Sequence, residues 1–281
     1  LQLSAQNTFL GGVDVTEGGI VLGANSTSTV PNGLVSGPLG IGATTFATGT
    51  TLFVDNTDRQ VANAMTYAGN PIFNNTGTTL RTLTLNGALS FATQTSTGLV
   101  ASIPTPFLNV VLGGPIANIG TVTAIGSATG ANTITKTGLG NITGINLTGV
   151  SNTATLDISG LTNGNTFSLL HDGDGTGSLQ NIGLGAITYN PTSSTVLNLT
   201  VGRAGNALNF ATPINKIIAP SSLTSTLLGN GLTVTNNNGY GLLLVDNIAF
   251  NTVSANQGPT FNVATANASL LRPGLTLNGQ L

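Results

Sequence analysis

Apolar and polar residues alternate in short runs along this chain, and glycine, asparagine and serine separate the runs. In residues 13–15 two valines flank Asp14, so a strand here points the valines one way and the aspartate the other. Gly18-Gly19 allows a tight turn, because glycine reaches positive φ without steric cost. Residues 20–22 begin the next run, with the isoleucine and the leucine on one face. The same alternation is found at 51–55, 59–65 and 80–85, and the last run ends at the turn dipeptide Asn86-Gly87.

This pattern predicts an all-β fold. Threonine, asparagine, serine and glycine are poor helix formers, and no window of about 12 residues keeps an apolar stripe at helical spacing. Short units that cannot bury a face alone usually stack on one another, so we expect a parallel β-solenoid with about 20–25 residues per coil. A β-sandwich has a similar strand spacing and is the alternative.

Composition narrows the class of protein. Charged residues make up 5% of the 281 residues, against about 25% in ordinary domains. Apolar residues reach 40% and the mean hydropathy is +0.31, which is enough apolar area for a folded core. A net charge of −2 with six basic residues argues against nucleic-acid binding. We also expect no membrane-spanning helix and, with no cysteine, no disulfide or thiolate metal site.

A longer motif resembles a known repeat. Residues 7–23 read Asn-Thr-Phe-Leu-Gly-Gly-Val-Asp-Val-Thr-Glu-Gly-Gly-Ile-Val-Leu-Gly, and related segments follow at 36–40, 59–63 and 83–87. This order resembles the autotransporter-associated β-strand repeat, also called the passenger-associated transport repeat. The resemblance covers residues 1–115, and residues 136–143 echo a further strand of the family.

The resemblance implies a right-handed parallel β-helix in a bacterial surface protein outside the cell. It therefore divides the chain into a repeat-like solenoid segment at 1–115 and a β-rich segment at 116–281. The second segment is expected to continue the same solenoid or to form a second packed β domain.

One acidic cluster is a candidate metal site. Asp172, Asp174 and Thr176 occupy alternate positions of a glycine-rich loop, as in the first half of a calcium loop. The acid expected at the twelfth position is replaced by Gly183. We therefore favour a solvated glycine-rich turn, with calcium as the alternative and no other cofactor expected.

The chain lacks the usual parts of an enzyme. His171 is the only histidine, so no histidine-based triad or metal site can form. The eight acids are scattered, and Asp55 and Asp58 beside Arg59 are expected to decorate a turn rather than to act as a catalytic pair. We predict that the protein is not an enzyme.

Strand-like sequence lies at both ends of the chain. Leu1 and Leu3 alternate with polar residues at one end, and Leu275 and Leu277 do so at the other. Open sheet edges offer unpaired N–H and C=O groups, and identical subunits that pair them grow head to tail. We expect a structural protein that assembles with copies of itself into a stiff fibre, filament or layer, with these four leucines at the contacts.

The alternative function is an adhesin or carbohydrate-binding passenger module that recognises glycans or host or neighbouring surfaces. Such a module needs an exposed aromatic or polar cluster. The three tyrosines, Tyr67, Tyr189 and Tyr240, are its expected contributors.

Overall fold

The fold is known from a computed structural model of the chain. The structure describes residues 1–29, 33–91, 99–114, 116–117, 124–126, 133–148, 155–159, 161, 166–172, 178–189, 196–203, 216–225, 232–237, 239–244, 248–250, 261–265 and 275–277. Within these residues it is all-β, with no helix, and therefore with none that is long and apolar enough to cross a membrane. The prediction of an all-β fold is confirmed.

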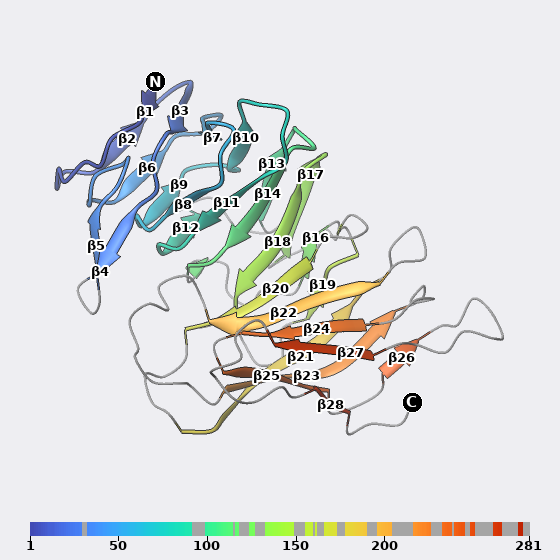
Figure 1. Cartoon of the computed structure of the whole chain (residues 1–281). Helices are drawn as coiled ribbons and strands as arrows, with labels where there is room; N and C mark the ends of the chain where they lie inside the picture. The colour runs from blue at the N-terminus through green and yellow to red at the C-terminus, as the bar shows by residue number, and fades with distance from the viewer. Residues whose placement is uncertain are drawn as a thin grey trace.

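Four parallel sheets and one hairpin contain all the strands (Figure 1). The seven-stranded sheet has the order β1 (Gln2–Leu3), β3 (Gly19–Leu22), β7 (Thr51–Val54), β10 (Ile72–Asn75), β13 (Leu99–Ile103), β17 (Thr133–Gly138) and β16 (Ala124–Gly126). The five-stranded sheet has the order β2 (Val13–Val15), β6 (Thr44–Phe46), β9 (Met65–Tyr67), β12 (Leu89–Phe91) and β15 (Ile116–Ala117).

The other two sheets extend to the C-terminal end. The eight-stranded sheet has the order β8 (Arg59–Val61), β11 (Arg81–Leu85), β14 (Leu108–Leu112), β18 (Asn141–Asn146), β20 (Thr166–His171), β22 (Leu197–Arg203), β24 (Leu232–Asn236) and β27 (Phe261–Thr265). The six-stranded sheet has the order β19 (Leu156–Asp157), β21 (Gln180–Thr188), β23 (Lys216–Ser225), β25 (Tyr240–Leu244) and β28 (Leu275–Leu277), with β26 (Ile248–Phe250) also paired to β23. The antiparallel hairpin is β4 (Thr27–Thr29) and β5 (Gly33–Ser36).

Most successive strands lie on different sheets, so the chain coils rather than folding back on itself. After β8 on the eight-stranded sheet it enters β9 on the five-stranded sheet and then β10 on the seven-stranded sheet, before returning with β11. Every pair within the four sheets is parallel, as a solenoid requires. A sandwich of antiparallel sheets is not what these residues form.

The coils vary more in length than the sequence pattern predicts. Thr51 pairs with Ile72, 21 residues later, which agrees with the expected 20–25. Gly19 pairs with Thr51, 32 residues later, because the hairpin β4–β5 lies within that coil. In the second half Leu197 pairs with Leu232, 35 residues later. Longer connections between strands, rather than longer strands alone, therefore set the coil length.

The core lies between the sheets, where inward side chains stack from one coil to the next. On the five-stranded sheet Phe46, Tyr67 and Phe91 are in register, and their rings are stacked with centroids 4.7 and 5.6 Å apart. Phe73 meets Tyr67 edge-on from the neighbouring seven-stranded sheet. Each stacked pair adds about 1 kcal/mol to the burial of its surface.

The number of strands per coil changes along the chain. The three-sheet region (β1–β17) uses the seven-, five- and eight-stranded sheets, whereas the two-sheet region (β18–β28) uses the eight- and six-stranded sheets. In the six-stranded sheet, β23 pairs with β25 through its first part and with β26 through its last part. The long strand β23 thus spans the positions that two shorter strands occupy on separate sheets in the three-sheet region. The eight-stranded sheet runs through both regions.

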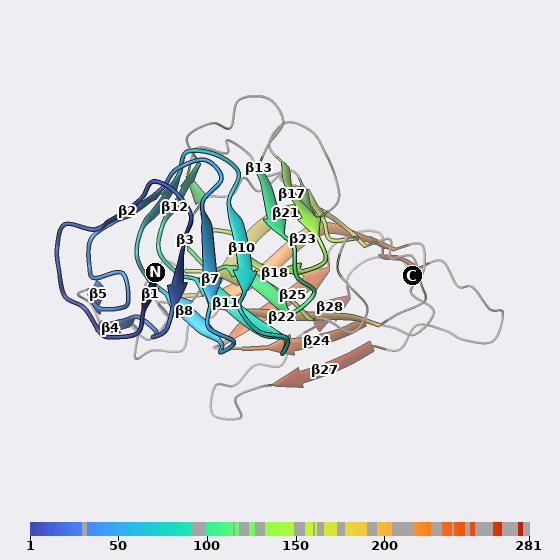
Figure 2. The ribbon, with the colours of Figure 1, turned by 90° about the horizontal axis from the view of Figure 1, so that it is seen from above.

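The two ends of the solenoid lie far apart. Figure 1 places β1 and β2 at one end of the molecule and β28 at the other, and Figure 2 shows the hairpin β4–β5 beside β1 and β2. Strands β1, β2 and β28 are each the edge strand of their sheet.

Candidate functional site

The N-terminal end of the solenoid has two open sheet edges. The backbone N–H of Val21 donates to Leu1 O at 2.8 Å, and that of Gly23 donates to Leu3 O at 2.9 Å. Alternate residues of a parallel strand bond to opposite sides, so the N–H and C=O of Gln2, between them, point away from β3. Strand β1 is the last strand of the seven-stranded sheet at this end.

Strand β2 is open in the same way. The N–H of Val13 donates to Ala43 O at 3.2 Å, and the N–H of Ala47 donates to Val15 O at 2.9 Å. The N–H and C=O of Asp14 therefore point away from β6, toward the free edge of the five-stranded sheet.

Apolar side chains gather at this end. Among the described residues, four of the seven exposed large apolar side chains lie in the first 35 positions. Leu1 is 81% exposed, Leu10 77% and Phe9 42%, with Val35 on the hairpin. Leu3 instead packs against the core. Two open edges beside exposed apolar side chains form a surface suited to another strand.

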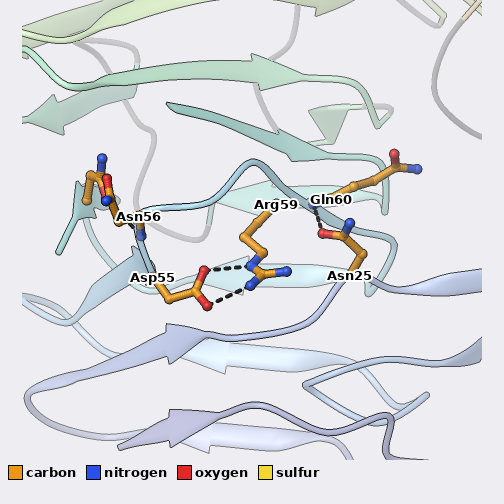
Figure 3. A network of polar contacts seen from close by, with 6 residues as sticks. Asn25, Asp55, Asn56, Arg59 and Gln60 are labelled. Carbon is orange, nitrogen blue, oxygen red and sulfur yellow. Dashed lines mark hydrogen bonds and ion pairs between the residues drawn. The ribbon is translucent and has the colours of Figure 1, made fainter. Parts of the chain in front are cut away.

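The third edge at this end is closed by side chains. Asn25 Oδ1 accepts the N–H of Gln60 at 3.0 Å (Figure 3). Ser26 Oγ accepts the N–H of Ala62 at 3.1 Å. The N–H of Ser26 donates to Gln60 O at 2.8 Å. These bonds satisfy the outer edge of β8, so the eight-stranded sheet has no free edge at this end.

Gln6 holds this closure in place. Its Nε2 donates to Asn25 O at 2.7 Å, and its Oε1 accepts from Ser36 Oγ at 2.8 Å. The closure therefore joins the first residues of the chain, the segment after β3 and the hairpin strand β5.

The predicted assembly residues lie at the two ends as expected from the sequence. Leu1 and Leu3 flank Gln2 on β1, and Leu275 and Leu277 are the first and last residues of β28, the edge of the six-stranded sheet. Whether they make contacts between copies stays a prediction. The closing residues Gln6, Asn25 and Ser26 were missed, because they lie in loops and their partners are 19–36 residues away.

The predicted calcium loop is described only at Asp172, since Asp174 and Thr176 lie outside the described residues. Asn146 Nδ2 donates to both oxygens of the Asp172 carboxylate at 3.2 Å, and the N–H of Asp172 donates to Thr148 Oγ1 at 2.8 Å. Among the residues that the structure describes, no three ligating side chains gather into a metal site.

Arg203 lies near Asp172. Burial lowers the pKa of Arg203, and its electrostatic interactions with Tyr240 and Asp172 oppose that shift. Lys216 is fully buried and donates from Nζ to Ser178 O at 2.9 Å, and Tyr240 donates from its hydroxyl to His171 O at 2.8 Å. A carboxylate held by an amide and placed near a guanidinium favours an internal polar cluster over a calcium loop.

The acids near Arg59 serve local structure. Arg59 donates from Nε and Nη2 to the two oxygens of Asp55 at 2.7 and 2.6 Å (Figure 3). The carboxylate of Asp58 accepts the N–H of Thr82 at 2.9 Å. The two acids thus have different partners: Asp55 bridges the turn between β7 and β8, and Asp58 joins that turn to β11.

The three tyrosines do not form an exposed cluster. Tyr67, Tyr189 and Tyr240 are all buried, with at most 2% of each exposed. The prediction that they contribute to an exposed aromatic binding surface is wrong, because inward positions on the strands place their rings in the core.

One shallow groove, of about 340 Å³, lies on the outer face of the five-stranded sheet. Asp14, Thr45 and Thr66 line it in register, and Thr45 Oγ1 donates to the Asp14 carboxylate. Ala47 and Ala68 form the adjoining floor. The groove is hollow because its outward side chains are small.

Comparisons with known proteins returned nothing. No protein-family model, no curated protein and no solved structure matches the chain. The resemblance to the autotransporter-associated repeat therefore stays a prediction from the residues.

Proposed function

We propose that this protein is a structural component of a bacterial cell surface, outside the cell, that assembles with copies of itself into a stiff fibre, filament or layer. The observation that carries the proposal is the pair of open edges, β1 and β2, beside exposed Leu1, Phe9 and Leu10. Natural sheets usually protect such edges, and one edge at this same end is protected.

The body of the solenoid suits a mechanical role. Backbone hydrogen bonds join each coil to the next where their parallel strands stack. The inward side chains form one continuous core. Few charged groups interrupt its faces, so copies can approach without strong repulsion. The low charge and the separate partners of Asp55 and Asp58 favour a structural role over catalysis.

Electron microscopy and sedimentation of the purified 281-residue chain test this proposal. We expect elongated assemblies whose mass grows with protein concentration. Dispersed monomers at the highest attainable concentration would contradict it.

Binding of glycans is the second candidate function. The groove on the five-stranded sheet supports it, because a carboxylate and two hydroxyls in register can accept and donate hydrogen bonds to sugar hydroxyls. A glycan array tests it, with Asp14→Asn as the matched variant. Saturable binding that Asp14→Asn weakens would support glycan recognition. Absence of binding to any glycan on the array would contradict this second candidate function.

A further inference from the structure

The order of strands around the coil says how two copies can join. In the three-sheet region the chain repeats one order: a strand of the eight-stranded sheet, then one of the five-stranded sheet, then one of the seven-stranded sheet. The last strands keep this order. Strands β25 and β28 each follow a strand of the eight-stranded sheet, as β9 follows β8, and β26 follows β25 as β10 follows β9.

Among the described strands, the first and the last therefore belong to successive places in the coil order. In this order the last described strand, β28, corresponds to β2, the first strand of the five-stranded sheet. In the same way β26 corresponds to β1, the first strand of the seven-stranded sheet. Strand β1 belongs to the seven-stranded sheet, which is the sheet that follows in the coil order. A second copy placed after the first can therefore continue two of the strand positions of the coil, those of β1 and β2.

Charge favours this joint over two N-terminal ends facing each other. The first 58 positions carry acids only, including Asp14 on β2 and Glu17 beside it. Two N-terminal ends facing each other would therefore bring like charges together.

From these observations we infer that the N-terminal end of one copy binds the C-terminal end of a second copy, with β28 pairing in parallel with β2 and β26 with β1. No strand of the eight-stranded sheet pairs between the two copies, because Asn25 and Ser26 already bond the outer edge of β8. The inference rests on the proposed self-assembly with head-to-tail growth, and it adds which strands make the joint.

Proline substitutions at the open edges test which strands pair. Asp14→Pro and Gln2→Pro each remove a backbone N–H that points away from the subunit's own sheet, so the fold keeps its ladder bonds. Asp14→Ala and Gln2→Ala remove the same side chains and keep the N–H. We expect each proline variant to weaken association about tenfold relative to its alanine control, measured by sedimentation velocity.

Circular dichroism checks that each variant remains folded. Folded proline variants that associate as strongly as the alanine controls would overturn the inference even if filaments form. Wild-type protein that never associates would overturn the proposed self-assembly itself. The two failures are therefore distinguishable.

Engineered disulfides test the polarity, because the chain has no cysteine of its own. Asp14→Cys and Thr276→Cys place thiols on the central residues of β2 and β28. Strands paired in parallel hold opposite residues within disulfide range, about 5 Å apart. We expect the double variant to give a ladder of linked oligomers on a non-reducing gel after mild oxidation, and Asp14→Cys alone to stay monomeric. Linked dimers from Asp14→Cys alone would show two N-terminal ends meeting and would overturn the inference.

Discussion

The three-sheet and two-sheet regions share one sheet but differ in how the chain leaves it. In the three-sheet region the chain turns sharply between β2 and β3 at Gly18, with φ of 68°, and between β6 and β7 at Gly49, with φ of 82°. In the two-sheet region β21 and β23 run through the corresponding place as single strands of 9 and 10 residues. A glycine at positive φ thus makes the corner at Gly18 and at Gly49, whereas the long strands β21 and β23 have no such corner.

The two regions also differ in how closely their coils approach at a corner. Where the chain leaves the eight-stranded sheet, a Cβ added at Gly87 would lie 1.9 Å from Asn63 O, and one added at Gly114 would lie 1.7 Å from Gly87 O. In the two-sheet region a Cβ added at Gly202, within β22, would lie 3.2 Å from Asn237 Cβ and 3.7 Å from Asn237 O. The corners at Gly87 and Gly114 therefore require glycine more strictly than the strand position Gly202 does.

The largest expected effect comes from filling such a corner. Gly87→Ala should lower the free energy of unfolding by about 3 kcal/mol, because the backbone of the preceding coil must move. Gly202→Ala in the two-sheet region should cost less than about 1 kcal/mol, and Gly11→Ala, with nothing within 4 Å, should cost least. Urea unfolding followed by circular dichroism measures all three. Equal losses of unfolding free energy for Gly87→Ala and Gly202→Ala would contradict the stricter need for glycine at Gly87.

Buried asparagines give the next contrast. Asn63 in the three-sheet region donates from Nδ2 to Gly42 O at 2.8 Å and to Gly40 O at 3.1 Å. Asn236 in the two-sheet region is also buried, yet neither atom of its amide has a partner among the described residues. Asn63→Leu should cost about 2 kcal/mol, since it leaves two buried carbonyls without a donor.

Asn236→Leu should leave stability unchanged or raise it by about 1 kcal/mol, because it removes an unsatisfied buried amide. The same urea titration compares the two variants. A loss at Asn236 as large as that at Asn63 would mean that the two amides contribute equally.

Alkaline pH should lower the free energy of unfolding through Tyr67, in the core of the three-sheet region. Burial raises the pKa of Tyr67 above its ordinary value of 10.0, so the folded state favours the neutral phenol. This contribution is complete below about pH 10 and is lost as pH rises above it, by about 1.4 kcal/mol per pH unit. Tyr67→Phe should lose less stability than wild type between pH 10 and 11. Identical alkaline losses in the two proteins would exclude Tyr67 as the source.

The smallest expected effect concerns the corner glycine itself. Gly49→Ala should cost about 1 kcal/mol from its positive φ alone, since nothing lies within 4 Å of the added Cβ. The reverse exchange, Ser221→Gly in β23, should also destabilise, by about 0.5–1 kcal/mol, because glycine is unfavourable within a strand. Thermal unfolding of both variants checks the pair. Stabilisation by Ser221→Gly would mean that the long strand β23 is itself strained.

Sequence patterns predicted the local features of this fold well. Alternation at 13–15 and 20–22 correctly places Val15, Ile20 and Leu22 inside and Asp14 outside. The turn at Gly18 is also confirmed by its positive φ. These features depend on neighbours in the chain, and the pleat of a strand determines which side chains share a face.

The candidate site was predictable only in part. Strand-like ends around Leu3 and Leu275 were visible in the sequence, and β1 and β28 are edge strands. The closure by Gln6, Asn25 and Ser26 was not visible, because each side chain reaches a partner far along the chain.

The sequence by itself determined that the chain forms short strands with one buried face, separated by turns. Only the tertiary structure decided that Asn86-Gly87 is a corner between parallel coils rather than a hairpin, and that three sheets give way to two. The physical reason is that alternation specifies which side of a strand is buried but not which strand it pairs with. Thr51 lies 21 residues from its partner Ile72 and Leu197 lies 35 residues from Leu232, and the stacking of whole coils selects such partners.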